Sequence, residues 1–193
     1  MLRMSNCTLS AASGSPNLVH IKVLEDASME VSGCSFKAVG VMAMGKLSMS
    51  SCSIRDASRG ALTAVPGCVM DVRGTKIKDC HMGVVVGAEP HPDAVQPISV
   101  VLTQCTITCQ QCGVCVDDPR ATVTLDRCFI EGATKGTCVS VPAGKLKVSK
   151  GVYATTSWTC EGIILESSKA SAELDGAALH MAKASTGLTL MDG

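Results

Sequence analysis

The sequence predicts an all-β solenoid: a single-stranded right-handed parallel β-helix of about eight coils, with three short strands in each coil. Three observations predict it. An eight-residue block recurs along the whole chain, a second block opens with glycine, and apolar and polar residues alternate within both blocks as they do in strands. The 193 residues are enough for a core, so residues 1–193 are expected to form one domain.

The first block has the pattern apolar, any, apolar, any, any, small, any, apolar. Its copies begin 18 to 30 residues apart, within the range typical of solenoid repeats. They occupy residues 2–9, 29–36, 47–54, 70–77, 100–107, 123–130, 146–153 and 172–179. The first two apolar positions alternate with polar residues and indicate a strand, and the residues before the sixth position are expected to bend the chain.

The second block starts with glycine, whose access to positive φ suits a corner. Its clear copies are Gly83–Val86, Gly113–Val116, Gly162–Leu165 and Gly187–Leu190; weaker copies begin at Gly60 and Gly136, and a shorter one at Gly40. One coil cannot bury its inner face alone. Successive coils are therefore expected to stack about 4.8 Å apart, with parallel pairing between their strands.

The chain has 12 cysteines, and the small sixth position of the first block holds five of them. Its occupants in order are Cys7, Cys34, Cys52, Thr75, Cys105, Cys128, Gly151 and Ala177. Their shared property is small size, so we expect packing residues at a tight inner corner. Stacked thiols such as Cys34 and Cys52 would approach disulfide spacing, but the in-register parallel geometry is poor for that bond.

Composition narrows the classes of function. Lys and Arg number 17 and Asp and Glu number 17, so the formal net charge is zero, which disfavours nucleic acids and anionic membranes as partners. No apolar run is long enough for a transmembrane helix. The first residues do not resemble a secretory signal, which favours a cytoplasmic location with free thiols. The only aromatic residues are Phe36, Phe129, Tyr153 and Trp158.

The repeated block, the glycine-led second strand and the irregular period resemble the right-handed β-helix repeats of the pectin-lyase-like superfamily. That resemblance implies one of two kinds of protein. Its enzymes act mainly on uronic-acid polymers, with carboxylates, Arg, Lys or His on the outer face of a sheet. Its non-catalytic members include the β-helix of F-box ubiquitin ligase receptors, which recognises a protein. The Asn-Thr-Asp, Gly-His-Gly and Arg-Ile-Lys motifs of the family's hydrolases do not occur in this sequence.

Two segments supply candidate catalytic residues. Asp117, Asp118 and Arg120 directly follow a predicted strand and form the best outward-facing charged group, although Asp-Asp-Pro is also an ordinary turn signal. The segment Glu89–Asp93 resembles the Asp-Pro-His-acid motif of alginate epimerases. The catalytic candidates are therefore His91, Asp117, Asp118 and Arg120, and the binding candidates are Glu89, His91, Asp93 and Trp158.

No metal or other cofactor is expected. Four cysteines lie close in sequence: Cys105, Cys109, Cys112 and Cys115. Cys105 belongs to the inner row of sixth positions, while the side chain of Cys115 is expected to point outward, so the four thiols should not converge on one metal ion. The histidines at 20, 81 and 180 have no neighbouring partners in the sequence and are expected to be surface or core residues.

Three segments exceed the minimal coil and are expected to project as loops: residues 10–19, 88–97 and 154–161. Neither end shows a capping sequence, which indicates either a fragment of a larger protein or open ends that dock onto another chain or, end to end, onto another copy. The sequence as a whole favours a non-catalytic scaffold whose partner is another protein. The alternative is a uronic-acid polysaccharide lyase, hydrolase or epimerase, or a carbohydrate-binding module.

Overall fold

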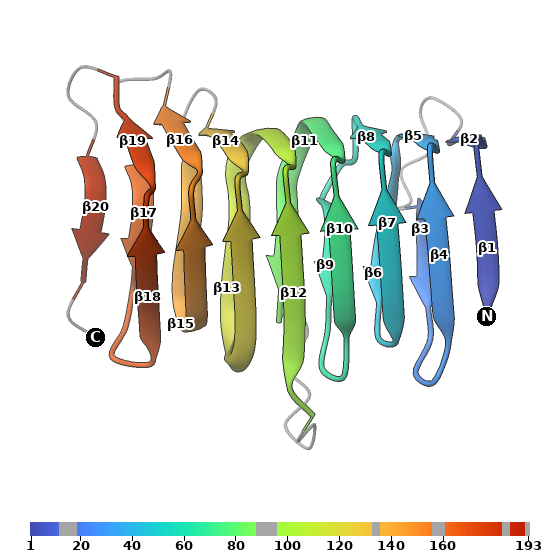
Figure 1. Ribbon diagram of the computed structural model, residues 1–193, viewed down its shortest axis with the longest axis horizontal. Coiled ribbons are helices and arrows are strands. Elements are labelled where there is room, and N and C mark those ends of the chain that lie inside the picture. The colour runs from blue at the N-terminus through green and yellow to red at the C-terminus, as the bar shows by residue number, and fades with distance from the viewer. Residues whose placement is uncertain (12–18, 88–95, 133–135, 156–160, 183–185, 192–193) are drawn as a thin grey trace.

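The chain forms a right-handed parallel β-helix (Figure 1), as the sequence predicts, with about seven turns, close to the eight coils expected. The computed structural model describes residues 1–11, 19–87, 96–132, 136–155, 161–182 and 186–191. The coils follow one another along the long axis from the N-terminal end, blue, to the C-terminal end, red. No helix long and apolar enough to cross a membrane occurs in the described residues.

Each coil contributes one strand segment to each of three parallel sheets. The first sheet contains β1 (Leu2–Ser5), β4 (Ser28–Ser32), β7 (Lys46–Ser50), β10 (Val69–Arg73), β12 (Ile98–Thr103), the ends of β13 (Thr106–Asp126) and β15 (Thr137–Ser149), and β18 (Ala170–Asp175). The second contains β2 (Thr8–Ser10), β5 (Ser35–Lys37), β8 (Ser53–Arg55), the starts of β11 (Lys76–Val86) and β13, and β14 (Phe129–Gly132), β16 (Val152–Thr155) and β19 (Ala178–His180). The third contains β3 (Val19–Val23), β6 (Val39–Ala43), β9 (Gly60–Ala64), the end of β11, the middle of β13, the start of β15, and β17 (Glu161–Leu165) and β20 (Thr186–Leu190).

The strand register coincides with the repeated first block. The first positions of all eight copies lie in one row, which is Leu2, Met29, Leu47, Met70, Val100, Val123, Leu146 and Ala172. The irregular intervals of the repeat are therefore real differences in coil length. Most of each of the three longer segments lies outside the described residues, at 12–18, 88–95 and 156–160.

The corner between the first and second sheets is made by one residue in the left-handed region. The fifth residue of every copy has a φ between 50° and 63°: Asn6, Gly33, Ser51, Gly74, Gln104, Arg127, Lys150 and Gly176. Three of these are glycines, for which this conformation is unstrained. The same conformation recurs at all eight places, so the corner belongs to the repeat itself.

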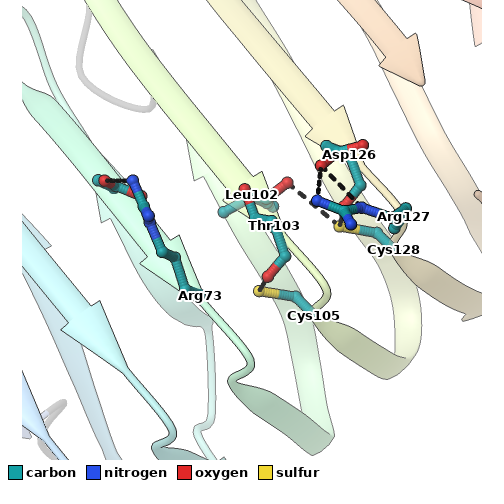
Figure 2. A network of polar contacts seen from close by, with 8 residues as sticks. Arg73, Leu102, Thr103, Cys105, Asp126, Arg127 and Cys128 are labelled. Atoms are coloured by element: carbon teal, nitrogen blue, oxygen red, sulfur yellow. Dashed lines mark hydrogen bonds and ion pairs between the residues drawn. The ribbon is translucent and has the colours of Figure 1, made fainter. Parts of the chain in front are cut away.

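The small sixth position carries a hydrogen bond that the sequence analysis did not predict. The Cys52 thiol donates to the carbonyl oxygen of Ser50, two residues earlier, at 3.2 Å. Figure 2 shows the equivalent bonds from Cys105 to Thr103, at 3.5 Å, and from Cys128 to Asp126. The hydroxyl of Thr75 makes the equivalent bond to Arg73 at 3.2 Å. The side chain at this corner must therefore be small. A weak hydrogen-bond donor is also favourable there, because it satisfies a carbonyl oxygen of the corner.

The glycine-led block is confirmed for most copies and corrected for two. Gly40, Gly83, Gly113, Gly162 and Gly187 lie in one row across the third sheet. In the coils of β9 and β15 the register places Ala61 and Cys138 in that row, one and two residues after Gly60 and Gly136. Gly60 is the first residue of β9, as predicted, and Gly136 immediately precedes β15, but both lie ahead of the glycine row, which there holds other small residues.

One continuous core fills the interior. It is made almost entirely of aliphatic, methionine and cysteine side chains, with Phe36 and Tyr153 fully buried among them. Eleven cysteines are described and all are free thiols, ten of them buried or half-buried. At the two ends of the solenoid, apolar side chains are exposed, including Leu2, Leu24, Leu188 and Leu190.

Candidate binding groove

A groove of about 520 Å³ lies on the outer face of the third sheet, across β3, β6, β9 and β11. Its lining combines three basic side chains with apolar and small residues, and none of the described lining residues carries a carboxylate. The lining residues are His20, Met42, Ser58, Arg59, Gly60, Thr63, His81, Met82 and Val85.

Strand alternation produces the floor of the groove. Met42, Thr63 and Val85 form one outward row across β6, β9 and β11, while the residues on either side of them in each strand point into the core. Lys22 continues the same row on β3. Parallel in-register strands hold these four side chains one coil apart, so the floor is rigid and preformed.

His20 forms one wall of the groove. It pairs with Gly40 in register, and its imidazole lies over that glycine: a Cβ atom at Gly40 would lie 2.6 Å from His20 Cδ2. The missing side chain at Gly40 therefore makes the space that the imidazole fills. Burial lowers the pKa of His20, and the positive charges of Lys22 and Arg59 lower it further.

Arg59 and His81 form a second wall of the groove, at the corner between the second and third sheets. Backbone hydrogen bonds fix this corner, since His81 N donates to Ala57 O at 3.1 Å and Met82 N donates to Arg59 O at 2.8 Å. Among the described residues, Arg59 takes part in no ion pair. The groove therefore presents a guanidinium whose charge is not neutralised by a neighbouring described residue.

The fold brings His20, Arg59 and His81 together, and the sequence analysis missed them. It expected the histidines at 20 and 81 to be isolated surface or core residues. The signal that would have found them is the register: once the glycine-led row is aligned, His20 takes the place of the glycine. The sequence alone places that row ambiguously, because Gly60 and Ala61 are both small enough to head the strand.

Four of the residues predicted from the sequence, Glu89, His91, Asp93 and Trp158, lie outside the described residues. The Asp117–Arg120 segment lies within β13, where its register shifts as the strand passes from the third sheet to the first. Asp117 is exposed, but Asp118 is only 4% exposed. The expectation that both aspartates face outward was therefore wrong for Asp118.

Asp118 and Arg120 form a local ion pair at this corner. The carboxylate of Asp118 accepts from the Arg120 backbone N–H at 2.8 Å and from Arg120 Nε at 2.9 Å, and Arg120 Nη2 lies 2.5 Å from Oδ2. These hydrogen bonds hold the pKa of Asp118 below its ordinary value. Because Asp118 already has these partners, we assign the pair to the corner of the fold.

We expect Asp118→Asn to lower the free energy of unfolding by about 1–2 kcal/mol at pH 7, because a buried charge-assisted pair is lost. The folded-state pKa of Asp118 is depressed, so its stabilisation is fully present above the unfolded-state pKa near 4 and disappears as the pH falls through the folded-state value. Urea unfolding at pH 7 and pH 3 measures this. The gap between wild type and variant should narrow at pH 3.

Asp117→Asn is the matched control. Burial and the charges of Glu166 and Asp118 raise the pKa of Asp117, so its ionisation opposes folding at neutral pH. The control should therefore not destabilise the protein at pH 7. If the two variants lost equal stability, or if the gap for Asp118→Asn were the same at both pH values, the Asp118–Arg120 ion pair would not be the cause of the lost stability.

A second polar group lies farther along the outer face of the third sheet. Ser140 on β15 donates a hydrogen bond to Glu166 Oε1, close to the half-buried Cys115 of β13. Burial raises the pKa of the Cys115 thiol to about 11, with the charges of Asp117 and Glu166 adding to the effect. The thiol is thus held protonated at neutral pH and is a poor nucleophile.

The cysteines of residues 105–115 point in different directions, as the sequence analysis expected. Cys105 lies in the inner ladder, whereas Cys115 is half exposed between the buried Val114 and Val116. Within the described part of the chain, no group of three or more His, Cys, Asp or Glu side chains is arranged to hold a metal ion.

A scan against protein-family models and searches of the curated proteins and of the solved structures found no match to this chain.

Proposed function

We propose that this protein is a β-solenoid scaffold of the pectin-lyase-like kind that binds a segment of another protein in the groove on its third sheet. The observation that supports the proposal is the composition of that groove. The apolar side chains of Met42, Met82 and Val85 share the groove with one arginine and two histidines, on strands that need not move to receive a ligand.

This combination suits a protein ligand. Protein interfaces join an apolar centre, which supplies most of the favourable free energy, to a polar rim that fixes orientation. Methionine side chains adapt to the shape of what they contact. A preformed site also binds with a smaller loss of conformational entropy. The β-helix of F-box receptors uses its coils in the same general way, for protein recognition.

The uronate enzymes of the same superfamily provide the alternative function. A polyuronate would meet the same basic walls, and histidine is able to serve as a base. The groove, however, offers thioether and aliphatic side chains where a sugar ring would be expected to stack on an aromatic one. The groove therefore favours a peptide.

The experiment compares two matched valine variants. Val85 in the groove and Val101 on the outer face of the first sheet are both half-buried, outward residues of internal strands. Random 12-residue peptides displayed on phage are selected on the wild-type protein and synthesised, and their dissociation constants are measured. We expect Val85→Glu to weaken them at least tenfold and Val101→Glu to leave them unchanged.

Two results would overturn the proposal. One is a set of peptides that bind both variants equally, or no selected peptide at all. The other is the appearance of unsaturated, ultraviolet-absorbing products or new reducing ends when the wild-type protein is incubated with polygalacturonate or alginate, with and without Ca²⁺.

A further inference from the structure

The charges of the groove define its ligand more closely, and the following inference rests on the proposed function. We infer that the groove selects an acidic peptide segment. Carboxylates of the ligand lie against Arg59, His20 and His81, while apolar side chains between them pack on Met42, Met82 and Val85.

The groove is locally basic although the whole chain has a formal net charge of zero. Its described lining includes one arginine and two histidines and no carboxylate. Lys22, in the same outward row as Met42, adds a further positive charge whose effect reaches His20. These positive charges repel one another. An anionic ligand reduces the repulsion, whereas a cationic ligand increases it.

Asp56 and Asp79 precede the Arg59 and His81 corner in the sequence. Both occupy positive-φ corner positions, at 59° and 56°. Burial raises the pKa of the Cys80 thiol next to His81, and the charges of Asp56 and Asp79 raise it further. Neither aspartate is among the described residues that line the groove, where the charged side chains are basic.

The size and the surface of the groove both suit a short peptide segment. A volume of about 520 Å³ holds a few side chains, which suits a short extended segment better than a whole domain. Three of the nine described lining residues, Met42, Met82 and Val85, are apolar, and none of the nine is Phe, Tyr or Trp. A ligand that is only charged would leave these apolar side chains uncovered, so apolar side chains must accompany the carboxylates.

The protonation state of His20 responds to an acidic ligand. Burial, Lys22 and Arg59 disfavour the imidazolium form of His20 in the free protein. A carboxylate bound beside it favours that form, so binding takes up a proton. Affinity for an acidic ligand is therefore expected to rise as the pH falls from 8 to 6.

The test uses three capped nine-residue peptides that differ only at alternate positions. One alternates leucine with glutamate, the second carries glutamine at the glutamate positions, and the third carries lysine. Fluorescence anisotropy at pH 6 and pH 8 gives their dissociation constants. We expect the glutamate peptide to bind at least tenfold more tightly than the glutamine peptide, the lysine peptide not to bind, and binding of the glutamate peptide to be tighter at pH 6.

Protein variants connect this selectivity to the groove. Arg59→Gln is expected to weaken the glutamate peptide about tenfold and to leave the glutamine peptide unchanged. Arg55→Gln is the control, since Arg55 is an exposed arginine of β8 outside the groove. The double variant His20→Gln, His81→Gln should lose the difference between pH 6 and pH 8. Far-ultraviolet spectra of each variant check that the β-helix remains folded.

The outcomes separate this inference from the proposed function. If the glutamine peptide binds as tightly as the glutamate peptide and both are weakened by Val85→Glu, the groove is a peptide site without acidic selectivity, and only the inference fails. If no peptide responds to Val85→Glu, both fail. If oligogalacturonates bind as tightly as the glutamate peptide and depend on Arg59, the ligand is an anionic saccharide and the peptide class is wrong.

Discussion

Gly83→Ala is expected to lower the free energy of unfolding by about 3 kcal/mol or more, among the largest effects of any single methyl group added to this chain. A Cβ atom at Gly83 would overlap the carbonyl oxygen of Gly113 in the next coil and would lie 2.7 Å from Ile107 Cγ2. A side chain can rotate away from such a contact, but a carbonyl oxygen in a parallel ladder cannot move without disturbing its own strand pairing. Urea unfolding followed by far-ultraviolet circular dichroism measures the loss.

Gly187→Ala is the matched control, because Gly187 occupies the same row in the last coil. There the atom nearest to an added Cβ is Leu179 Cδ1 at 3.4 Å, which is an ordinary contact. The control should change stability by less than about 1 kcal/mol. Equal losses at the two positions would mean that glycine is needed for its backbone freedom throughout the row, and the steric explanation would be wrong.

The sequence predicted the repetitive part of the fold well, because each inner position is constrained in every coil. Cys34, Cys52, Cys105 and Cys128 lie in one row as expected. Inner residues repeat because they must stack on one another along the axis. A pattern that recurs in eight copies can be recognised in a single sequence even though its period varies.

The groove was not predictable by the same reasoning, because its residues are not repeated. His20, Arg59 and His81 come from different coils and become neighbours only when the register of the third sheet is known. The sequence left that register ambiguous by one or two residues at Gly60 and Gly136. The prediction that Asp118 is exposed was wrong for a related reason. A polar residue next to a corner is easily assumed to be exposed, whereas here the Arg120 side chain pairs with Asp118.

Departures from the repeat also carry structural information, and Gly151 is the clearest of them. It occupies the sixth position, which elsewhere holds Cys, Thr or Ala, and two residues later the aliphatic or phenyl side chain of the eighth position is replaced by Tyr153. Tyr153 is fully buried, and among the described residues its hydroxyl has no hydrogen-bond partner. The larger ring occupies the space that a side chain at Gly151 would need.

We expect Gly151→Cys alone to cost about 2–3 kcal/mol, because the new Cβ would lie 2.8 Å from Tyr153 Oη and 2.9 Å from both Tyr153 Cε2 and Cys128 O. Tyr153→Ile restores the Cys–Ile pair that the preceding coil has at Cys128 and Ile130. The double variant should therefore be at least about 1 kcal/mol more stable than the sum of the two single effects predicts. A double-mutant cycle from urea unfolding measures this coupling.

Tyr153→Phe separates the two parts of the contact. It removes the hydroxyl and keeps the ring, so it should relieve the clash with Gly151→Cys only in part and give a smaller coupling than Tyr153→Ile. On its own, Tyr153→Phe should not destabilise the protein, because it removes a buried hydroxyl that has no partner among the described residues. Additive single effects would contradict the compensation and leave Gly151 explained by its contact with the Cys128 carbonyl alone, since that contact is independent of the tyrosine.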